Sequence, residues 1–268
     1  MTATPHDALF KFAFSNRETA AGELATVLPS AIVQRLDLAR LTVCPGSFVD
    51  QELAQRHSDL LYSVPTMSGT ETLVYVLFED QSSVDTRMPF RLLSYVVRIW
   101  EKHLRDHPAA ATLPPVIPVV LHHGATGARW AGATRLSELL DGTPDLLQAL
   151  APYLPDFAFV LDDLGEHGDD VLRLRAMTAL GRAALWALKS SRQPGRVLEQ
   201  LPAWASVLHE VLAAPRGMEA LAAVLRYILL VADVGPRELA TALERQLGPK
   251  GTEAFVTGAQ ILQQEALE

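Results

Sequence analysis

The sequence predicts an α/β fold, in which a mixed sheet is flanked by helices and followed by an all-helical C-terminal region. Short apolar runs that are typical of strands alternate with amphipathic helical segments up to about residue 165. From Asp169 to the end, every segment between the Gly and Pro breaks has helical periodicity. We therefore divide the chain into residues 1–168, which hold the sheet, and residues 169–268, which form a helical region.

The first elements are mostly helical. Residues 7–28 carry apolar side chains on one face at a 3.6-residue period and predict a single helix. Residues 29–36 open with proline and predict a short second helix. Residues 42–49 then predict a short strand, which a Pro-Gly pair interrupts.

The remaining strands surround one long helix. Residues 56–64 and 72–81 are apolar runs joined by a short turn, so they predict neighbouring strands. The amphipathic segment 88–106 and the apolar run 116–121 complete a strand–helix–strand crossover, which makes strands 72–81 and 116–121 parallel. A last strand is predicted at residues 156–162.

The helical region contains about five segments, as judged from its Gly and Pro breaks. The breaks fall at residues 193–195, 214–215, 235–236 and 248–251.

Composition limits the function classes. The chain has 268 residues, of which 49% are hydrophobic and 20% charged, as in ordinary globular proteins. Its net charge of −8 argues against sequence-independent coating of nucleic acid, but a local basic groove remains compatible with it. The single cysteine, Cys44, excludes an intramolecular disulfide and a cysteine-based zinc site, and we interpret it as a small core residue.

No membrane segment is predicted. The N-terminus lacks the basic-then-apolar order of a signal peptide. The most apolar late stretch, residues 220–234, contains Arg226 and Asp233 and is shorter than the roughly 18 residues of a spanning helix. We therefore expect a cytoplasmic protein.

Polar side chains at two neighbouring strands form the candidate site. Asp59 lies on the first strand, and Glu79-x-Gln81 ends the second. Residues 79 and 81 share one face of a strand, because side chains alternate. Burying carboxylates is costly without a partner, and a hard cation such as Mg²⁺ is one such partner. The pattern therefore indicates a metal-dependent phosphodiesterase centre.

The helix that follows the site has a basic face. At 100° per residue, its cationic side chains fall within an arc of roughly 60°, opposite its apolar side chains. These residues are Arg91, Arg98, Lys102 and Arg105. They predict a surface for a phosphate backbone; the alternative is a solvated helix face whose charges Glu101, Asp106 and water balance.

Several landmarks in order resemble the recombination-promoting nuclease family, which is also described as a transposase family. They are His6-Asp7-x-Leu9-Phe10-Lys11, Val27-Leu28-Pro29, Ser47-Phe48-Val49-Asp50, Ser58-Asp59-Leu60-Leu61-Tyr62, Leu77-Phe78-Glu79-Asp80-Gln81-Ser82-Ser83, Met88-Pro89-Phe90-Arg91-Leu92-Leu93, Arg98-Ile99-Trp100-Glu101 and Leu113 to Gly124. The resemblance extends from residue 6 to about residue 165, and the landmarks are specific as a set.

The resemblance implies a restriction-endonuclease-like fold of the PD-(D/E)XK superfamily and a metal-dependent DNA endonuclease linked to recombination. It assigns Asp59 and Glu79 as the acidic motif residues, and Gln81 stands where the superfamily usually has lysine. His6, Asp7, Phe10 and Lys11 match an N-terminal signature without an assigned role. The family reads Glu-His-Gln-Ser where this chain has Asp80 in place of the histidine.

The resulting hypothesis is that Asp59 and Glu79 bind Mg²⁺, with Mn²⁺ as a substitute, while Gln81 orients the attacking water. Lys11 is expected to contact the phosphate if the first helix packs near the strand ends. DNA is expected to bind with little sequence specificity, since nothing in this set reads bases.

Simpler interpretations stay open. Asp59 could cap a turn or pair with Arg56, and Glu79 and Gln81 could form a solvated strand end. His122 and His123 point to opposite faces of a strand, which favours structural roles over one shared metal. Capping of the next segment is the favoured interpretation of Asp162-Asp163, with a second cation site as the alternative.

Two rival functions remain. A catalytically degenerate nuclease fold would act as a nucleic-acid-binding or protein-interaction module, which Asp80 and Gln81 favour. The second rival is an assembly module, in which the helical region would form a homo-oligomer and the sheet would have a structural role.

Overall fold

A computed structural model describes residues 4–44, 60–67 and 73–265 of the chain, with the backbone alone for residues 73–81, 126 and 265. Its strands are β1 (Thr42–Val43), β2 (Leu60–Pro65), β3 (Leu73–Gln81), β4 (Val116–His122) and β5 (Val160–Asp163). Its α-helices are α1 (Pro5–Phe14), α2 (Arg17–Val27), α3 (Ser30–Val33), α5 (Met88–Asp106), α6 (Pro144–Leu150), α7 (Asp169–Arg173), α8 (Ala179–Ser190), α9 (Arg196–Ala213), α10 (Gly217–Val231), α11 (Pro236–Leu247) and α12 (Pro249–Glu265). Short 3-10 turns occur at Leu38–Arg40, Ala125–Gly127, Leu136–Leu139 and Ala151–Tyr153.

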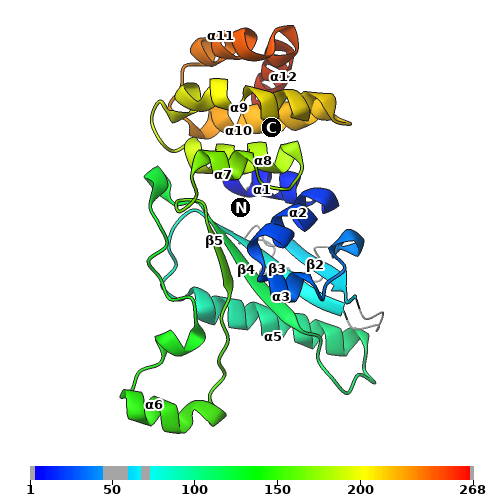
Figure 1. The fold of residues 1–268 in the computed structure, drawn as a ribbon, viewed down its shortest axis with the longest axis vertical. Coiled ribbons are helices and arrows are strands. Elements are labelled where there is room, and N and C mark those ends of the chain that lie inside the picture. The colour runs from blue at the N-terminus through cyan, green and yellow to red at the C-terminus, as the bar shows by residue number, and fades with distance from the viewer. Residues whose placement is uncertain (1–3, 45–59, 68–72, 266–268) are drawn as a thin grey trace. The chain divides into compact units, whose positions relative to one another are not determined.

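The five strands form one mixed sheet in the order β1-β2-β3-β4-β5 (Figure 1). β1, β2 and β3 are antiparallel neighbours, whereas β3, β4 and β5 are parallel. The chain passes from β3 to β4 through α5, so the predicted strand–helix–strand crossover is confirmed. β3 and β4 each pair with a strand on both sides, and both are largely apolar up to their carboxyl ends.

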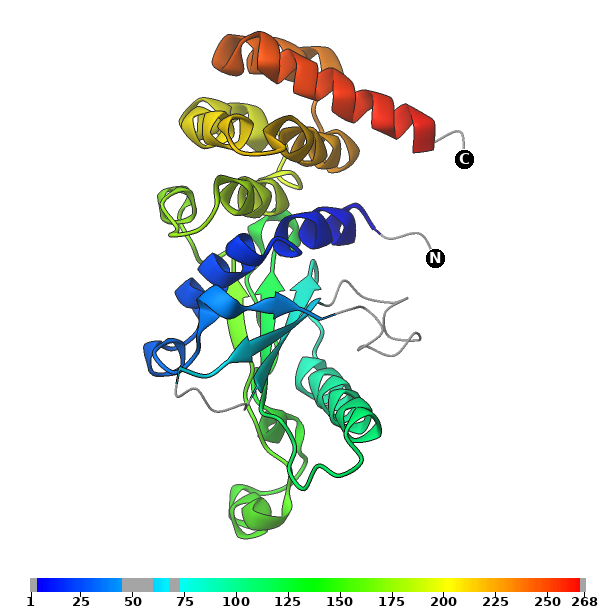
Figure 2. The ribbon, with the colours of Figure 1, turned by 90° about the vertical axis from the view of Figure 1, so that its right-hand side faces the viewer.

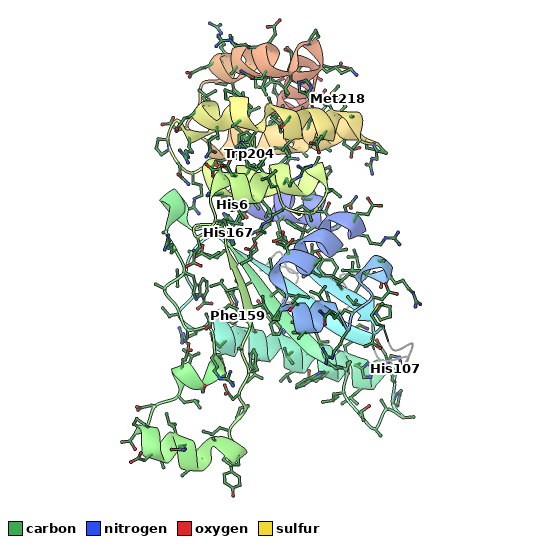
Figure 3. All side chains as sticks on the ribbon, in the orientation of Figure 1. His6, His107, Phe159, His167, Trp204 and Met218 are labelled. Atoms are coloured by element: carbon green, nitrogen blue, oxygen red, sulfur yellow. The ribbon has the colours of Figure 1, made fainter. Side chains whose placement is uncertain are left out.

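The helix α5 covers one face of this sheet, and its buried side chains make the core there (Figure 2). Met88, Leu92, Tyr95 and Ile99 recur at helical spacing and pack against side chains from the strands. The strand side chains in this cluster are Leu61 of β2, Val120 of β4, and Phe159, which directly precedes β5 and is labelled in Figure 3. The bounds of α5 agree with the predicted segment 88–106.

Cys44 packs at the margin of this core and is half-buried. Burial raises the pKa of its thiol to about 11, because desolvation disfavours the thiolate. The thiol is therefore protonated near neutral pH and a poor nucleophile. This agrees with the interpretation of Cys44 as a packing residue.

The helices α1, α2 and α7 to α12 make a second compact unit, which contains residues 2–26, 123–129 and 164–268. Within it, α1 packs against α8 and α10, and α10 packs against α9 and α12. The stacked indoles of Trp186 and Trp204 are fully buried in it, with ring centroids 5.5 Å apart, and Figure 3 labels Trp204. The first unit contains residues 27–122 and 130–163. The helices at the two ends of the chain therefore belong to one unit. The boundary predicted at residue 168 instead divides the chain into two continuous segments.

The prediction of one helix at residues 7–28 is wrong. The structure has two helices, α1 and α2, because Asn16 interrupts them and caps the second. The Asn16 Oδ1 accepts hydrogen bonds from the backbone N–H groups of Glu18 and Thr19, at 2.9 and 3.0 Å. Asparagine is among the preferred N-cap residues, and this short-range bond competes with a continuous helix.

Other boundaries shift by a few residues. The short helix predicted at residues 29–36 is limited to α3, and the last strand begins at Val160, four residues later than predicted. Of the strand predicted at residues 42–49, β1 covers residues 42–43, and residues 45–49 lie outside the described residues. The breaks predicted in the helical region all separate helices from α8 to α12.

Among the described residues, none of the helices combines the length and the apolar character that crossing a bilayer requires.

Candidate functional site

The backbone of Glu79 and Gln81 lies at the carboxyl end of β3, which has a neighbour on each side. Glu79 is in register with Val120 of β4, and Gln81 with His122. On the other side, the last registered pair toward this end joins Phe78 to Leu60 of β2. Asp59, the residue before Leu60, lies outside the described residues, as do the side chains of Glu79 and Gln81.

Three polar residues, Gln81, His122 and Asp163, are aligned in register across β3, β4 and β5. His122 of β4 is in register with Asp163 of β5, and both side chains are buried. The carboxyl ends of parallel strands meet at one edge of a sheet, which is where ligands bind in open α/β folds. This edge therefore presents Glu79, Gln81, His122 and Asp163 from three adjacent strands.

The loop residue Trp130 organises the far end of this row. Its backbone N–H donates a 2.6 Å hydrogen bond to the Asp163 Oδ2, and its indole meets the His122 ring edge-on at 5.2 Å. Asp163 therefore holds the loop that follows β4, and capping of the segment after β5 stays a prediction. Its partner is 33 residues earlier in the chain, so local pattern analysis could not identify it.

The donor set of this edge suits a hard divalent cation, because carboxylate oxygens are the ligands that Mg²⁺ and Mn²⁺ prefer. Among the side chains that the structure describes, no cluster of three or more from His, Cys, Asp or Glu could hold a metal ion. A metal site here therefore depends on Asp59 and Glu79, whose carboxylates lie outside the described side chains.

The basic face of α5 is formed as the angular analysis predicts, and Arg91 and Lys102 on it make ion pairs. Arg91 makes a 3.0 Å ion pair with Asp85, and Lys102 makes a 2.9 Å pair with Asp106. The hydrogen bond from Lys102 holds the pKa of the Asp106 carboxyl below its usual range. Arg98 is half-buried and Arg105 is exposed.

The adjacent histidines take different surroundings, as alternation along a strand predicts. His122 contacts Trp130 in the sheet unit. His123 belongs to the helical unit, where its ring lies 5.0 Å from that of His6. The His6 Nδ1 is in turn 2.8 Å from the hydroxyl of Tyr227 on α10. The signature residue His6 thus has a structural partner that is 221 residues away and that sequence analysis missed.

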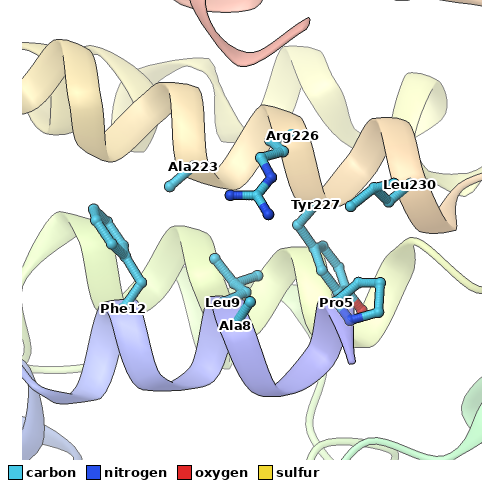
Figure 4. A pocket seen from close by; sticks show the side chains of 8 residues that line it. All are labelled: Pro5, Ala8, Leu9, Phe12, Ala223, Arg226, Tyr227 and Leu230. Atoms are coloured by element: carbon cyan, nitrogen blue, oxygen red, sulfur yellow. The ribbon is translucent and has the colours of Figure 1, made fainter. Parts of the chain in front are cut away.

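A small pocket lies between α1 and α10, inside the helical unit (Figure 4). It encloses about 90 Å³ and is lined mostly by apolar side chains, among them Leu9, Phe12 and Leu230. Arg226 and Tyr227 supply its polar groups. Lys11, another signature residue, is half-buried on α1 and does not line this pocket.

Residues 4–218 match the family described as "Putative transposase, YhgA-like". The recombination-promoting nuclease RpnD of Escherichia coli O157:H7 is 37% identical over 164 residues, which cover 60% of this chain and 62% of the relative. RpnA of Escherichia coli K12, which bears the same description, is 37% identical over 123 residues, or 46% of this chain and 41% of the relative.

Some relatives carry a different description. The inactive recombination-promoting nuclease-like protein RpnE of Escherichia coli K12 is 33% identical over 179 residues, which cover 67% of this chain and 57% of the relative. The matches thus span between two fifths and two thirds of the length of these relatives. No solved structure matches the chain.

Proposed function

Since the chain belongs to the YhgA-like transposase family, whose relatives include recombination-promoting nucleases, we propose that it is a metal-dependent DNA endonuclease. The proposed fold is restriction-endonuclease-like, with Asp59, Glu79 and Gln81 as the active centre. The mixed sheet and the crossover through α5 support this proposal.

The strand register is the observation that carries the proposal. Leu61 of β2 is in register with Leu77, and Val120 of β4 with Glu79. Leu61 and Val120 both pack into the core under α5. Residues in register share a face of the sheet, and faces alternate along each strand. Positions 77, 79 and 81 are therefore assigned to the α5 face.

The same alternation extends to the first motif residue. Asp59 is two positions before Leu61, so an extended chain would place it on the α5 face as well. Asp59, Glu79 and Gln81 would then converge on one face at neighbouring strands. The convergence of these three residues was predicted from their spacing in the sequence, and the strand register supports it.

In the proposed mechanism, the carboxylates of Asp59 and Glu79 hold the cation. When bound, Mg²⁺ would lower the pKa of a coordinated water and neutralise charge on the attacked phosphate. The Gln81 carboxamide both donates and accepts hydrogen bonds, so it can orient the attacking water, but it cannot take its proton. Lys11 remains a proposed phosphate contact.

Nicking of supercoiled plasmid tests the function. We expect the purified chain to convert supercoiled DNA to the open circle with Mg²⁺ or Mn²⁺ and to leave it intact with EDTA. The reaction should not depend strongly on plasmid sequence, because the proposed contacts are to phosphates. A folded preparation that cleaves equally well in EDTA would contradict metal dependence.

A non-cutting DNA-binding protein is the second candidate, because a relative described as inactive matches a larger share of this chain than RpnD does. Asp80 also replaces the histidine that the family usually carries, next to Gln81. DNA binding without cleavage in any metal would favour this candidate.

The basic face of α5 is expected to contribute to the affinity for DNA. The double change Arg98→Gln and Arg105→Gln should weaken DNA binding and reduce the slope of log K against log salt by about two, since each phosphate contact contributes about one. Fluorescence anisotropy over a salt series measures this slope. The matched control is Arg35→Gln with Arg40→Gln, which removes equal charge from exposed residues of the same unit. An equal loss in both variants would argue against a specific role for α5.

A further inference from the structure

His6 of the N-terminal signature lies in a polar cluster within the helical unit. Its Nδ1 and the hydroxyl of Tyr227 share a 2.8 Å hydrogen bond, and the two rings meet edge-on with centroids 5.5 Å apart. The ring of His123 lies 5.0 Å from that of His6. Tyr227 and His123 are 2% and 1% exposed, so the cluster is almost entirely removed from solvent. We refer to His6, His123 and Tyr227 as the histidine–tyrosine cluster.

Three segments that are far apart in the sequence supply this cluster. His6 is in the first turn of α1, Tyr227 is in the C-terminal half of α10, and His123 directly follows β4. α1 and α10 pack against each other, and Figure 4 shows Tyr227 reaching from α10 toward α1. Burying polar groups costs free energy even when they are hydrogen-bonded, so apolar side chains would join these segments at a lower cost. The polar cluster instead joins them through a bond of defined direction.

His123 connects the cluster to the candidate site through one peptide bond. The preceding residue, His122, is the last residue of β4 and is in register with Gln81 of β3. His122 is itself fully buried and meets the indole of Trp130 edge-on. Ring contacts therefore hold two consecutive residues at this strand end, and the strand is the one that pairs with the Gln81 backbone.

We propose that His6 is a positioning residue for the nuclease reaction and that it acts through His123 on the carboxyl end of β4. The hydrogen bond with Tyr227 orients the His6 ring, and this ring holds His123 and the strand end that His123 follows. This role rests on the proposed function and adds to it a residue outside the acidic motif. It does not require His6 to touch the DNA or the cation.

The placement of a strand end affects the rate because the reacting groups have to be aligned. A displacement of about 1 Å that originates far from the reacting atoms can slow a reaction about 10²-fold. Loss of alignment lowers kcat, whereas loss of a contact that binds the substrate and the transition state equally raises KM. Deleting the hydrogen bond while both rings stay in place should therefore lower kcat and leave the KM for DNA unchanged.

Nicking kinetics test this role with variants that delete the hydrogen bond and keep the rings. Tyr227→Phe and His6→Phe should each lower kcat about tenfold in Mg²⁺, with KM unchanged. The double variant should be no slower than either single variant, because both changes remove the same bond. His6→Asn should recover part of the rate, since its amide can hydrogen-bond to the Tyr227 hydroxyl. Losses that multiply in the double variant would show that His6 does not act through Tyr227.

Thr19→Val is the matched control, because it also deletes one hydroxyl from a hydrogen bond of the same unit. The Thr19 Oγ1 lies 2.5 Å from the Thr178 Oγ1, and Thr19 is fully buried. Thermal unfolding should show similar decreases in Tm for Thr19→Val and Tyr227→Phe, but Thr19→Val should keep the original kcat. Equal losses of kcat in the two variants would mean that stability alone sets the rate, and the proposal would be wrong.

Hydrogen exchange measures the hold on the strand end without DNA cleavage. In Tyr227→Phe, the backbone amides of the last residues of β4 should exchange at least tenfold faster than in the original chain, with no such change in Thr19→Val. Unchanged exchange and kcat in Tyr227→Phe, in a chain that nicks DNA, would refute the positioning role alone. A chain that nicks no DNA in any metal would refute the proposed function itself, so the two failures are distinguishable.

Discussion

Replacing Glu79 by glutamine is expected to slow metal-dependent DNA nicking by about 10³-fold or more. Lewis-acid stabilisation by a bound metal contributes several kcal/mol to the transition state, and each 1.36 kcal/mol corresponds to a tenfold change in rate. Glutamine keeps the size of the side chain and removes the charge that binds the cation. Rates of plasmid nicking in Mg²⁺ measure the effect, and Asp59→Asn should match it if the two carboxylates act together.

Asp80 supplies the matched control for this variant. Asp80→Asn removes the same charge one position further along β3, and alternation assigns that position to the opposite face of the sheet. Its rate should stay within a few-fold of the original. Equal losses from Glu79→Gln and Asp80→Asn would show that the effect comes from net charge, and full activity in Glu79→Gln would remove Glu79 from the site.

Replacing Glu23 by alanine is expected to destabilise the helical unit by about 3–5 kcal/mol, because it leaves the charge of Arg175 buried without its partner. The Arg175 Nη1 donates to both oxygens of the Glu23 carboxylate, at 2.7 and 2.9 Å. The two side chains are 0% and 2% exposed, for Glu23 and Arg175 respectively. Thermal unfolding should show a decrease in Tm of about 10 °C.

The surface pair Arg216–Glu219 provides the contrast. Its atoms approach to 2.6 Å, yet both side chains are exposed. Glu219→Ala should therefore change stability by less than about 1 kcal/mol. The double change Glu23→Leu with Arg175→Met should cost less than Glu23→Ala, since it removes both buried charges. A Tm for Glu23→Ala that equals that of Glu219→Ala would refute the importance of the buried pair.

The parallel part of the sheet could be predicted from sequence because its signals are local. Residues 116–121 are continuously apolar, and residues 88–106 are amphipathic with a helical period, so the crossover follows from handedness and length. The break between α1 and α2 could not be predicted in this way. The apolar period continues through Phe14 and Leu24, and the Asn16 cap that interrupts the helix has no effect on that period.

The candidate site was predictable only in part, for a similar reason. The spacing of Glu79 and Gln81 follows from strand geometry, and the register adds the face on which these positions lie. The contact of Asp163 with Trp130 and that of His6 with Tyr227 depend on the tertiary fold. Angular analysis of α5 also gave one wide apolar arc. In the structure the sheet covers only part of that arc, and Phe90, Val97 and Leu104 of α5 are exposed.

The packing of α1 between elements from the other end of the chain has a consequence during synthesis. Phe10 and Phe14 of α1 are fully buried, and α1 packs against α8 and α10. α10 ends at Val231, so more than 200 residues must be translated between α1 and its last partner. At about 5–20 residues per second, the ribosome needs roughly 10–40 s for that interval. α1 is thus fully covered only after α10 has been made, and its phenylalanines are open to chaperones during that interval.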